Sequence, residues 1–429
     1  MKKSKFFKST LILVIGGFIT KLLSMLIKIV MTRIIGTEGI GLYMLINPTF
    51  ILFIAIAILG MPTAISKLVS EDKNNNKNLV FSSVFISILI NIVLFIAILF
   101  SSRFISNNLL HEPRTYYSII CIGFVLPFIS ISSILRGYFF GRQKMFPHVI
   151  SNVFEDIIRL ITIILFIPFF IMKGLEFAVA FLVLTNIISE LASILILFLF
   201  LPKNFKLTQK DIKPNLNNIK DIMTISLPTT GSRLIGSISM FLEPILLTTI
   251  LLKVGYSNNF IITEYGILNG YVMPLILLPS FFTLAISEAL LPVISNSFSN
   301  KNFSYTKKKI KQAIFFSLLI GIPATLIFVF IPEIPLKFIY NTNEGINYIK
   351  FLAPIVLLHY IQSPLTTVLQ ATNNSKIAMN GTLVGMILKN LFLIILCFIK
   401  IGMWGLIISV SINIIYVTLH HIYWVKKII

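Results

Sequence analysis

Two lysines, Lys21 and Lys28, lie deep inside the first apolar run of the chain. They are seven residues apart, close to two turns of an α-helix, so they share one face with Gly17 and Ser24. An ionised side chain near the bilayer centre costs at least ~2.5–3.5 kcal/mol and usually faces a cavity or a partner. We therefore predict a water-facing cationic stripe that binds an anionic group. The alternative, snorkelling to an interface, suits Lys28 better than Lys21.

Further cations stand in other apolar runs. Arg33 marks the outer end of the first run, Arg233 lies within 222–252, and Lys389 lies within 377–399. Gly236 and Ser239 share a helix face that Arg233 flanks, although small residues also allow close helix packing. A guanidinium needs anionic or carbonyl partners, so packing does not explain Arg233. The sequence predicts that these cations line one substrate cavity.

Arg159 belongs to the same candidate set, but its neighbours Glu155 and Asp156 are four and three residues away. That spacing also allows a local ion pair within one helix. Glu190 and Glu243 lie inside apolar runs and are candidates to bind a coupling Na⁺ or H⁺. Glu190 could equally neutralise a neighbouring cation.

Prolines inside the apolar runs are candidates for hinges, because proline removes a backbone donor and bends a helix. The hinge or gating candidates are Pro48, Pro228, Pro244 and Pro274. No Asp-rich magnesium motif, zinc-ligand spacing, nucleotide-binding glycine loop or nucleophile–base set is present in the sequence. We therefore expect no catalytic residues, no metal and no cofactor, and a transporter in place of an enzyme.

The composition identifies the solvent that surrounds these residues. Of 429 residues, 56% are hydrophobic and 12% are charged. Soluble proteins average about 45–50% apolar and about 25% charged, so a soluble enzyme or a disordered chain is excluded. The net charge of +21 comes from 36 Lys and Arg against 15 Asp and Glu. These cations cluster between apolar runs, which indicates membrane topology and not nucleic-acid binding.

The sequence predicts an all-α polytopic membrane protein with about twelve transmembrane helices, because each apolar run has the ~20 residues needed to span a bilayer. The predicted spans are 9–33, 43–66, 79–101, 115–139, 148–172, 176–201, 222–252, 266–293, 308–331, 349–371, 377–399 and 402–424. A polar, lysine-rich segment, 202–221, divides them. We predict an N-terminal six-helix lobe over 1–201, a cytoplasmic linker over 202–221 and a C-terminal six-helix lobe over 222–429.

Charge asymmetry sets the predicted orientation. Lys and Arg are concentrated in the segments that lie on the same side as the N-terminus. The positive-inside rule then places the protein in the cell membrane with both termini in the cytoplasm. A weak internal repeat, TEGIGLYMLINP at 37–48 against TEYGILNGYVMP at 263–274, favours two halves related by an axis along the membrane normal.

Four stretches carry a family resemblance: GGFITKLLSMLIKIVMTRIIGTEGIGLYMLINP, GMPTAISKLVSE, LPTTGSRLIGSISMFLEPIL and LPSFFTLAISEALLPVIS. They resemble the stage V sporulation protein B-like polysaccharide flippases of the multidrug/oligosaccharidyl-lipid/polysaccharide exporter superfamily, with MurJ-type lipid II flippases as distant relatives. The resemblance implies two lobes in a MATE/MurJ-like V shape, alternating access and a lipid-linked sugar cargo. Lys21 and Arg33 match basic positions of the MurJ first helix. Such flippases usually have fourteen spans, whereas twelve are predicted here.

Together these features predict a flippase that moves an undecaprenyl-pyrophosphate-linked sugar, a peptidoglycan precursor for the spore cortex, from the inner to the outer leaflet. Its partners would be the anionic lipid-linked saccharide and the bilayer, and its energy would come from membrane potential or from Na⁺ or H⁺ coupling. One alternative is a cation-coupled multidrug exporter of the same fold. Another is a non-transporting scaffold that recruits cell-wall synthesis proteins.

Overall fold

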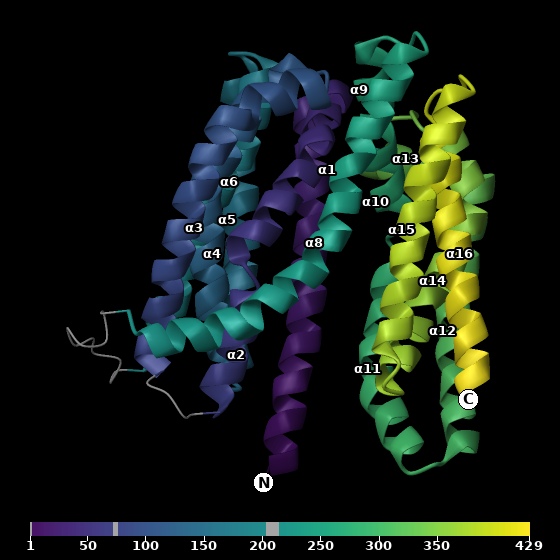
Figure 1. The fold of residues 1–429 in the computed structure, drawn as a ribbon. Helices are drawn as coiled ribbons and strands as arrows, with labels where there is room; N and C mark the ends of the chain where they lie inside the picture. Colours follow the sequence, from purple (N-terminus) through teal and green to yellow (C-terminus); the bar gives the residue numbers. More distant parts are fainter. Residues whose placement is uncertain (1, 72–75, 203–213) are drawn as a thin grey trace. The chain divides into compact units, whose positions relative to one another are not determined.

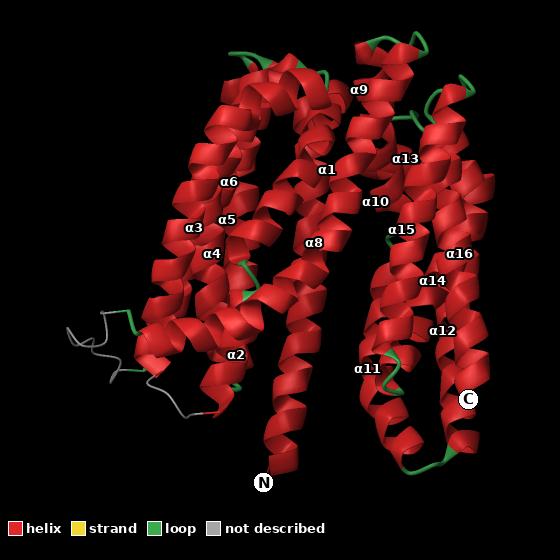
Figure 2. Ribbon diagram, in the orientation of Figure 1, coloured by secondary structure: helices red, strands yellow, loops and turns green. Residues whose placement is uncertain are grey.

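The structure is a computed structural model that describes residues 2–71, 76–202 and 214–429. Every regular element in these ranges is a helix, and short loops join the helices (Figure 2). The chain divides into two compact units, Met1–Phe241 and Leu242–Ile429. The predicted linker, 202–221, includes residues 203–213, which lie outside the described ranges.

Unit 1 is a bundle in which α3, α4, α5 and α6 run alongside one another, with α1 packed against α4 and α5 (Figure 1). Its elements are α1 (Lys2–Ile58), α2 (Met61–Glu71), α3 (Asn76–Phe104), η1 (Ile105–Leu109), η2 (Pro113–Thr115), α4 (Tyr116–Gly141), α5 (Met145–Ile171), α6 (Leu175–Leu199) and the first part of α8 (Leu216–Lys253).

The division between the units falls inside α8, because the first part of this helix is packed into unit 1. Ile222 is fully buried in a core cluster with Met61 and Ile65. The buried Asn218 side chain donates a hydrogen bond to Asn78 Oδ1 at 2.7 Å. These contacts attach the start of α8 to α2 and α3.

Unit 2 contains the remainder of α8 and a bundle in which α14 packs against α11, α12 and α16, with α15 against α16 (Figure 1). Its further elements are α9 (Asn258–Gly266), η3 (Ile267–Val272), α10 (Met273–Ile276), α11 (Ser280–Ser299), α12 (Phe303–Phe330), α13 (Glu333–Tyr340), α14 (Ile346–Ala371), α15 (Ser375–Phe398) and α16 (Trp404–Ile428).

The first two predicted spans, 9–33 and 43–66, do not correspond to two separate continuous helices. Both begin within α1, which is kinked at Gly36 (φ 71°, ψ −177°), a conformation that glycine adopts without strain. The predicted span 43–66 is not continuous, since α1 ends at Ile58 and α2 begins at Met61. Leu59 and Gly60 between them have positive φ. A Cβ at Gly60 would lie 2.8 Å from the backbone oxygen of Ser226, so the turn needs glycine for space as well.

The predicted span 266–293 is also broken. Its first part contains a π-helical turn, η3, and the helices on either side of Leu277–Pro279 are bent by 53°. Pro274 lies at the start of α10, close to this break, whereas Pro48, Pro228 and Pro244 lie within continuous helices. Whether any of these prolines is a hinge stays a prediction.

In the described ranges, nine helices are long and apolar enough to cross a membrane, or ten if the bent pair Asn258–Ile276 and Ser280–Ser287 is one span. The predicted number was about twelve. Two features account for the difference: α1 joins two predicted spans into one helix, and α5 carries the charges of Glu155, Asp156 and Arg159. The prediction of an all-helical membrane protein is confirmed.

Candidate functional site

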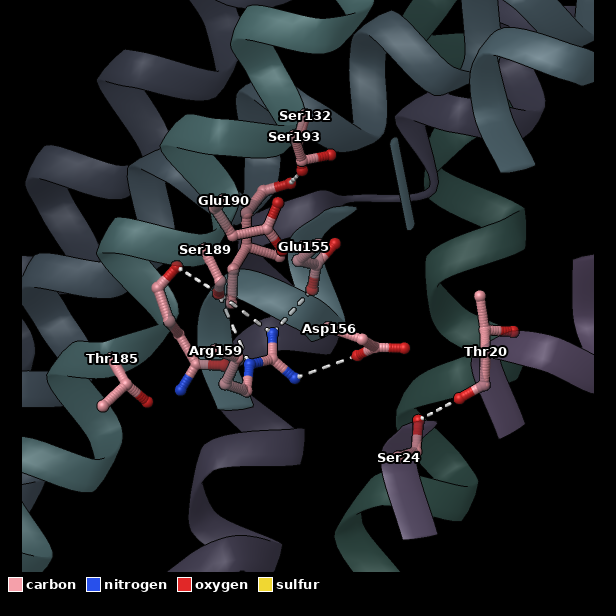
Figure 3. A network of polar contacts seen from close by, with 12 residues as sticks. Thr20, Ser24, Ser132, Glu155, Asp156, Arg159, Thr185, Ser189, Glu190 and Ser193 are labelled. Carbon is pink, nitrogen blue, oxygen red and sulfur yellow. Dashed lines mark hydrogen bonds and ion pairs between the residues drawn. The ribbon is translucent and has the colours of Figure 1, made fainter. Parts of the chain in front are cut away.

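A polar cluster of unit 1 joins α4, α5 and α6 (Figure 3). Arg136 on α4 forms an ion pair with Glu155 on α5 and lies 3.5 Å, Nη2 to Oε2, from Glu190 on α6. Arg159 Nη2 donates to Glu155 Oε1 at 2.6 Å, and its Nη1 is 3.9 Å from Asp156 Oδ1. Glu155 therefore bridges two guanidinium groups that come from different helices.

Serine hydroxyls on α6 add hydrogen bonds to both arginines. Ser193 Oγ accepts from Arg136 Nη2 at 2.7 Å, and Ser189 Oγ accepts from Arg159 Nη2 at 3.3 Å. These serines and Glu190 lie within one turn of α6, so that one helix face meets α4 and α5. A buried charge is tolerated when it is paired and hydrogen-bonded, which is the situation of both arginines here.

The cluster holds two guanidinium groups and three carboxylates, so its acids exceed its bases by one. One of these acids is Glu190, whose side chain is 6% exposed. Its Oε2 is buried and accepts no hydrogen bond within the described part of the chain. Its contact with Arg136 is thus electrostatic, without hydrogen-bond geometry.

Sequence reasoning missed the role of Arg136. Arg136 is not among the predicted site residues, although it lies inside the predicted span 115–139. That position was the available signal, since a charge inside a span needs a partner. For Arg159, the local pairing with Glu155 and Asp156 that the spacing allows is present in the structure.

The lysines of α1 are in a different environment. Lys21 is exposed and Lys28 is half-buried. Ser24 Oγ donates to the backbone oxygen of Thr20 at 2.8 Å, and Thr32 Oγ1 to that of Lys28 at 2.6 Å, so the hydroxyls of the stripe bond to their own helix. In the ranges that the structure describes, Lys28 forms no ion pair with a carboxylate.

Two further predicted cations are exposed. Arg33 lies one turn before the kink of α1 at Gly36. Arg233 lies near the middle of α8 and has no carboxylate partner among the described residues. Ser237, one turn further on, donates to the Arg233 backbone oxygen at 3.2 Å.

In unit 2, the structure brings two predicted site residues together. Lys389 Nζ on α15 donates to Glu243 Oε2 on α8 at 2.5 Å. Their side chains are 12% and 15% exposed. Tyr265 on α9 donates its hydroxyl to Glu243 Oε1 at 3.1 Å, so three helices meet at this carboxylate. The ammonium of Lys389 already occupies the place beside Glu243 that a coupling cation would take.

Comparisons with known proteins agree with this architecture. The sequence matches the family described as "Polysaccharide biosynthesis protein" over residues 6–298, and the family described as "MatE" over residues 236–396. It is 36% identical to Stage V sporulation protein B of Bacillus subtilis (strain 168), over 100% of this chain and 85% of that protein. It is 23% identical to Lipid II flippase MurJ of the same organism, over 90% of this chain and 76% of that protein.

Among solved structures, the inward-facing conformation of a multidrug resistance MATE family transporter of the MOP superfamily is similar, with a TM-score of 0.77. The likeness covers 95% of this chain and 94% of that chain at 16% sequence identity, and it concerns the fold. The protein is thus a helical membrane protein with the fold of a MATE family transporter of the MOP superfamily. Within that class, the chain belongs to the polysaccharide biosynthesis protein family.

Proposed function

We propose that this protein moves a lipid-linked saccharide with an anionic phosphate linkage from the inner to the outer leaflet by alternating access. One observation carries the proposal. Within the described ranges, Lys28 and Arg233 lie on apolar helices without a carboxylate partner. The other cations near the cores, Arg136, Arg159 and Lys389, each have one.

The charges of cargo and protein complement each other. An unpaired cation near the bilayer centre costs ~2.5–3.5 kcal/mol, and a phosphate in hydrocarbon is costly for the same reason. Arg233 would bind a phosphate with two parallel donors, whereas Lys28 and Lys21 would act as point charges. Arg159 and Lys389 would first have to exchange a carboxylate for the cargo. That cations from both halves line one cavity is part of the proposal.

The relatives support a finer assignment of the cargo. One is named a lipid II flippase and another a stage V sporulation protein. Together they favour a peptidoglycan precursor linked to undecaprenyl pyrophosphate, for the spore cortex, as the cargo of this chain. The asymmetry of Lys and Arg along the sequence supports an orientation with both termini in the cytoplasm.

Membrane potential is the simplest source of energy, because it acts on a charged cargo with ~2.3 kcal/mol per charge per 100 mV. Ion coupling is the alternative, and the two acidic candidates are not equivalent. Glu243 is neutralised by Lys389, whereas Glu190 keeps a buried oxygen without a hydrogen bond in the described part of the chain. Glu190 is therefore the better candidate to bind a proton or Na⁺.

Flipping of an undecaprenyl-pyrophosphate-linked disaccharide in proteoliposomes tests the proposal. Lys28→Gln and Arg233→Gln should each slow flipping about tenfold or more, because a charge-assisted hydrogen bond contributes about 1.5–3 kcal/mol. Lys337→Gln, on the exposed side of α13, is the matched control and should keep the wild-type rate. Full flipping by both cavity variants would refute the proposal. Efflux of a cationic dye without lipid flipping would favour the drug exporter, and no transport of either would favour the scaffold.

A further inference from the structure

Unit 2 contains a polar pocket between α11 and α14, two helices that run side by side (Figure 1). Its volume is about 410 Å³, within the range of about 300–1,000 Å³ typical of small-molecule sites. Apart from two leucines, the described residues that line it carry hydroxyl, amide or imidazole groups, and none of them carries a carboxylate, ammonium or guanidinium. The pocket is thus chemically distinct from the ion-paired clusters.

The polar residues are spaced so that they form two facing stripes. On α14, His359, Gln362 and Thr366 follow each other at intervals of three and four residues. On α11, Ser280 and Thr283 have the same spacing. Residues at such intervals lie on one face of a helix. Both helices belong to apolar segments, where a polar face normally lines a cavity.

The α14 stripe presents a donor and an acceptor side by side. His359 Nδ1 lies 3.1 Å from Gln362 Oε1, and an amide oxygen can only accept, so Nδ1–H is the donor. In the neutral imidazole that carries its proton on Nδ1, Nε2 of His359 is an acceptor. The contact also leaves the amide NH₂ of Gln362 as a donor.

The α11 stripe adds hydroxyl oxygens with free lone pairs. Thr283 donates to the Ser280 backbone oxygen at 3.0 Å, and Ser287 to that of Thr283 at 2.6 Å, so their oxygens can still accept. Ser280 Oγ is buried and, among the residues that the structure describes, has no hydrogen-bond partner. A buried hydroxyl without a partner costs free energy unless a ligand or water satisfies it.

We propose that this pocket binds an uncharged sugar unit of the cargo. The inference rests on the proposed function and deepens it, because it separates a sugar subsite from the cations that bind the phosphate. Sugar hydroxyls both donate and accept, which matches the alternation of imidazole nitrogen, amide and hydroxyl groups. Among the described lining residues, a phosphate or an organic cation would find no opposite charge to compensate for its lost hydration.

Binding measurements on the purified full-length protein in nanodiscs test the subsite with two probes. The probes are bare undecaprenyl pyrophosphate and the same lipid carrying an N-acetylhexosamine disaccharide. The wild type should bind the sugar-bearing lipid more tightly. Gln362→Leu and His359→Leu should each reduce the ratio of the two affinities about tenfold, the equivalent of one or two net hydrogen bonds. Affinity for the bare lipid should stay unchanged.

Gln312→Leu is the matched control, since it makes the same substitution on α12, where Gln312 accepts from Lys309 Nζ outside this pocket. It should keep the full preference. If both pocket variants bind the bare lipid normally and retain the preference, the sugar subsite is refuted while the flippase proposal stands. A wild type without any preference also refutes the subsite. A wild type that binds neither probe refutes both proposals.

Discussion

The pair between Glu243 and Lys389 offers a sharp test of how unit 2 is held together. The 2.5 Å contact joins side chains that are only 15% and 12% exposed, so neither charge can be fully solvated when its partner is removed. Removing one partner of a buried pair destabilises a protein by about 3–5 kcal/mol, whereas replacing both by neutral groups is often close to neutral. We expect Lys389→Met to lower the free energy of unfolding by about 3 kcal/mol, the lower end, because Tyr265 still donates to the carboxylate.

The double variant Glu243→Gln/Lys389→Met should recover most of that loss, which gives the two sites a large coupling energy in a double-mutant cycle. Equilibrium unfolding in detergent is the measurement. The matched control is the pair of Glu333 and Lys350, at 3.7 Å with side chains 47% and 45% exposed. Solvent screens such a pair, so Lys350→Met should change stability by no more than about 1 kcal/mol.

The same variant tests whether the Lys389 ammonium occupies the position beside Glu243 that a coupling ion would take. Without the ammonium, Glu243 is a buried carboxylate that a monovalent ion can neutralise, so Lys389→Met should become more stable in sodium chloride than in choline chloride. The wild type should show no such difference, since Lys389 already neutralises Glu243. The reasoning is refuted if Lys389→Met is as stable as the wild type. Equal loss in the single and double variants would refute it as well.

Two further predictions concern unit 1. Gly60→Ala should lose about 1–3 kcal/mol of stability, because its Cβ would lie 2.8 Å from the Ser226 backbone oxygen and the residue has φ 60°. Gly17→Ala is the control and should be neutral or stabilising, since a Cβ at Gly17 would meet nothing within 4 Å. Thermal unfolding compares the two variants. Arg136→Ala should lose about 3–5 kcal/mol, because it leaves the buried Glu190 without its cation and Glu155 with Arg159 alone. Arg142→Ala, exposed at the end of α4, should stay within about 1 kcal/mol of the wild type, and similar stability of the two variants would contradict the network.

The positions of the helices could be predicted from hydropathy, because the bilayer demands long apolar runs with internally bonded backbone. The interruption at Leu59 and Gly60 could not, since residues 50–61 around it include no polar side chain and hydropathy does not detect a change of backbone direction. Only the left-handed conformation of Gly60 and its close approach to Ser226, far away in the sequence, reveal the turn.

The candidate site was predictable as a set of residue types but not as a set of partners. The spacing of Glu155 and Arg159 along one helix showed that they could pair, and they do. Lys389 and Glu243 are 146 positions apart in the sequence, and Arg136 on α4 pairs with Glu190 on α6. No local sequence pattern could identify these residues as partners. Sequence spacing reports neighbours within a helix, whereas these pairs depend on how helices pack against each other.

These pairings change which cations are the strongest candidates for cargo binding. A guanidinium or ammonium that is already neutralised must give up a carboxylate before it can bind a phosphate, and that exchange leaves a buried carboxylate behind. Arg159 and Lys389 face this cost, whereas Lys28 and Arg233, with no carboxylate partner in the described ranges, do not. The paired residues can hold the helices of each unit in register, and the cations without such a partner gain most from an anionic headgroup. Loss of charge should therefore impair folding at the first kind of position and transport at the second.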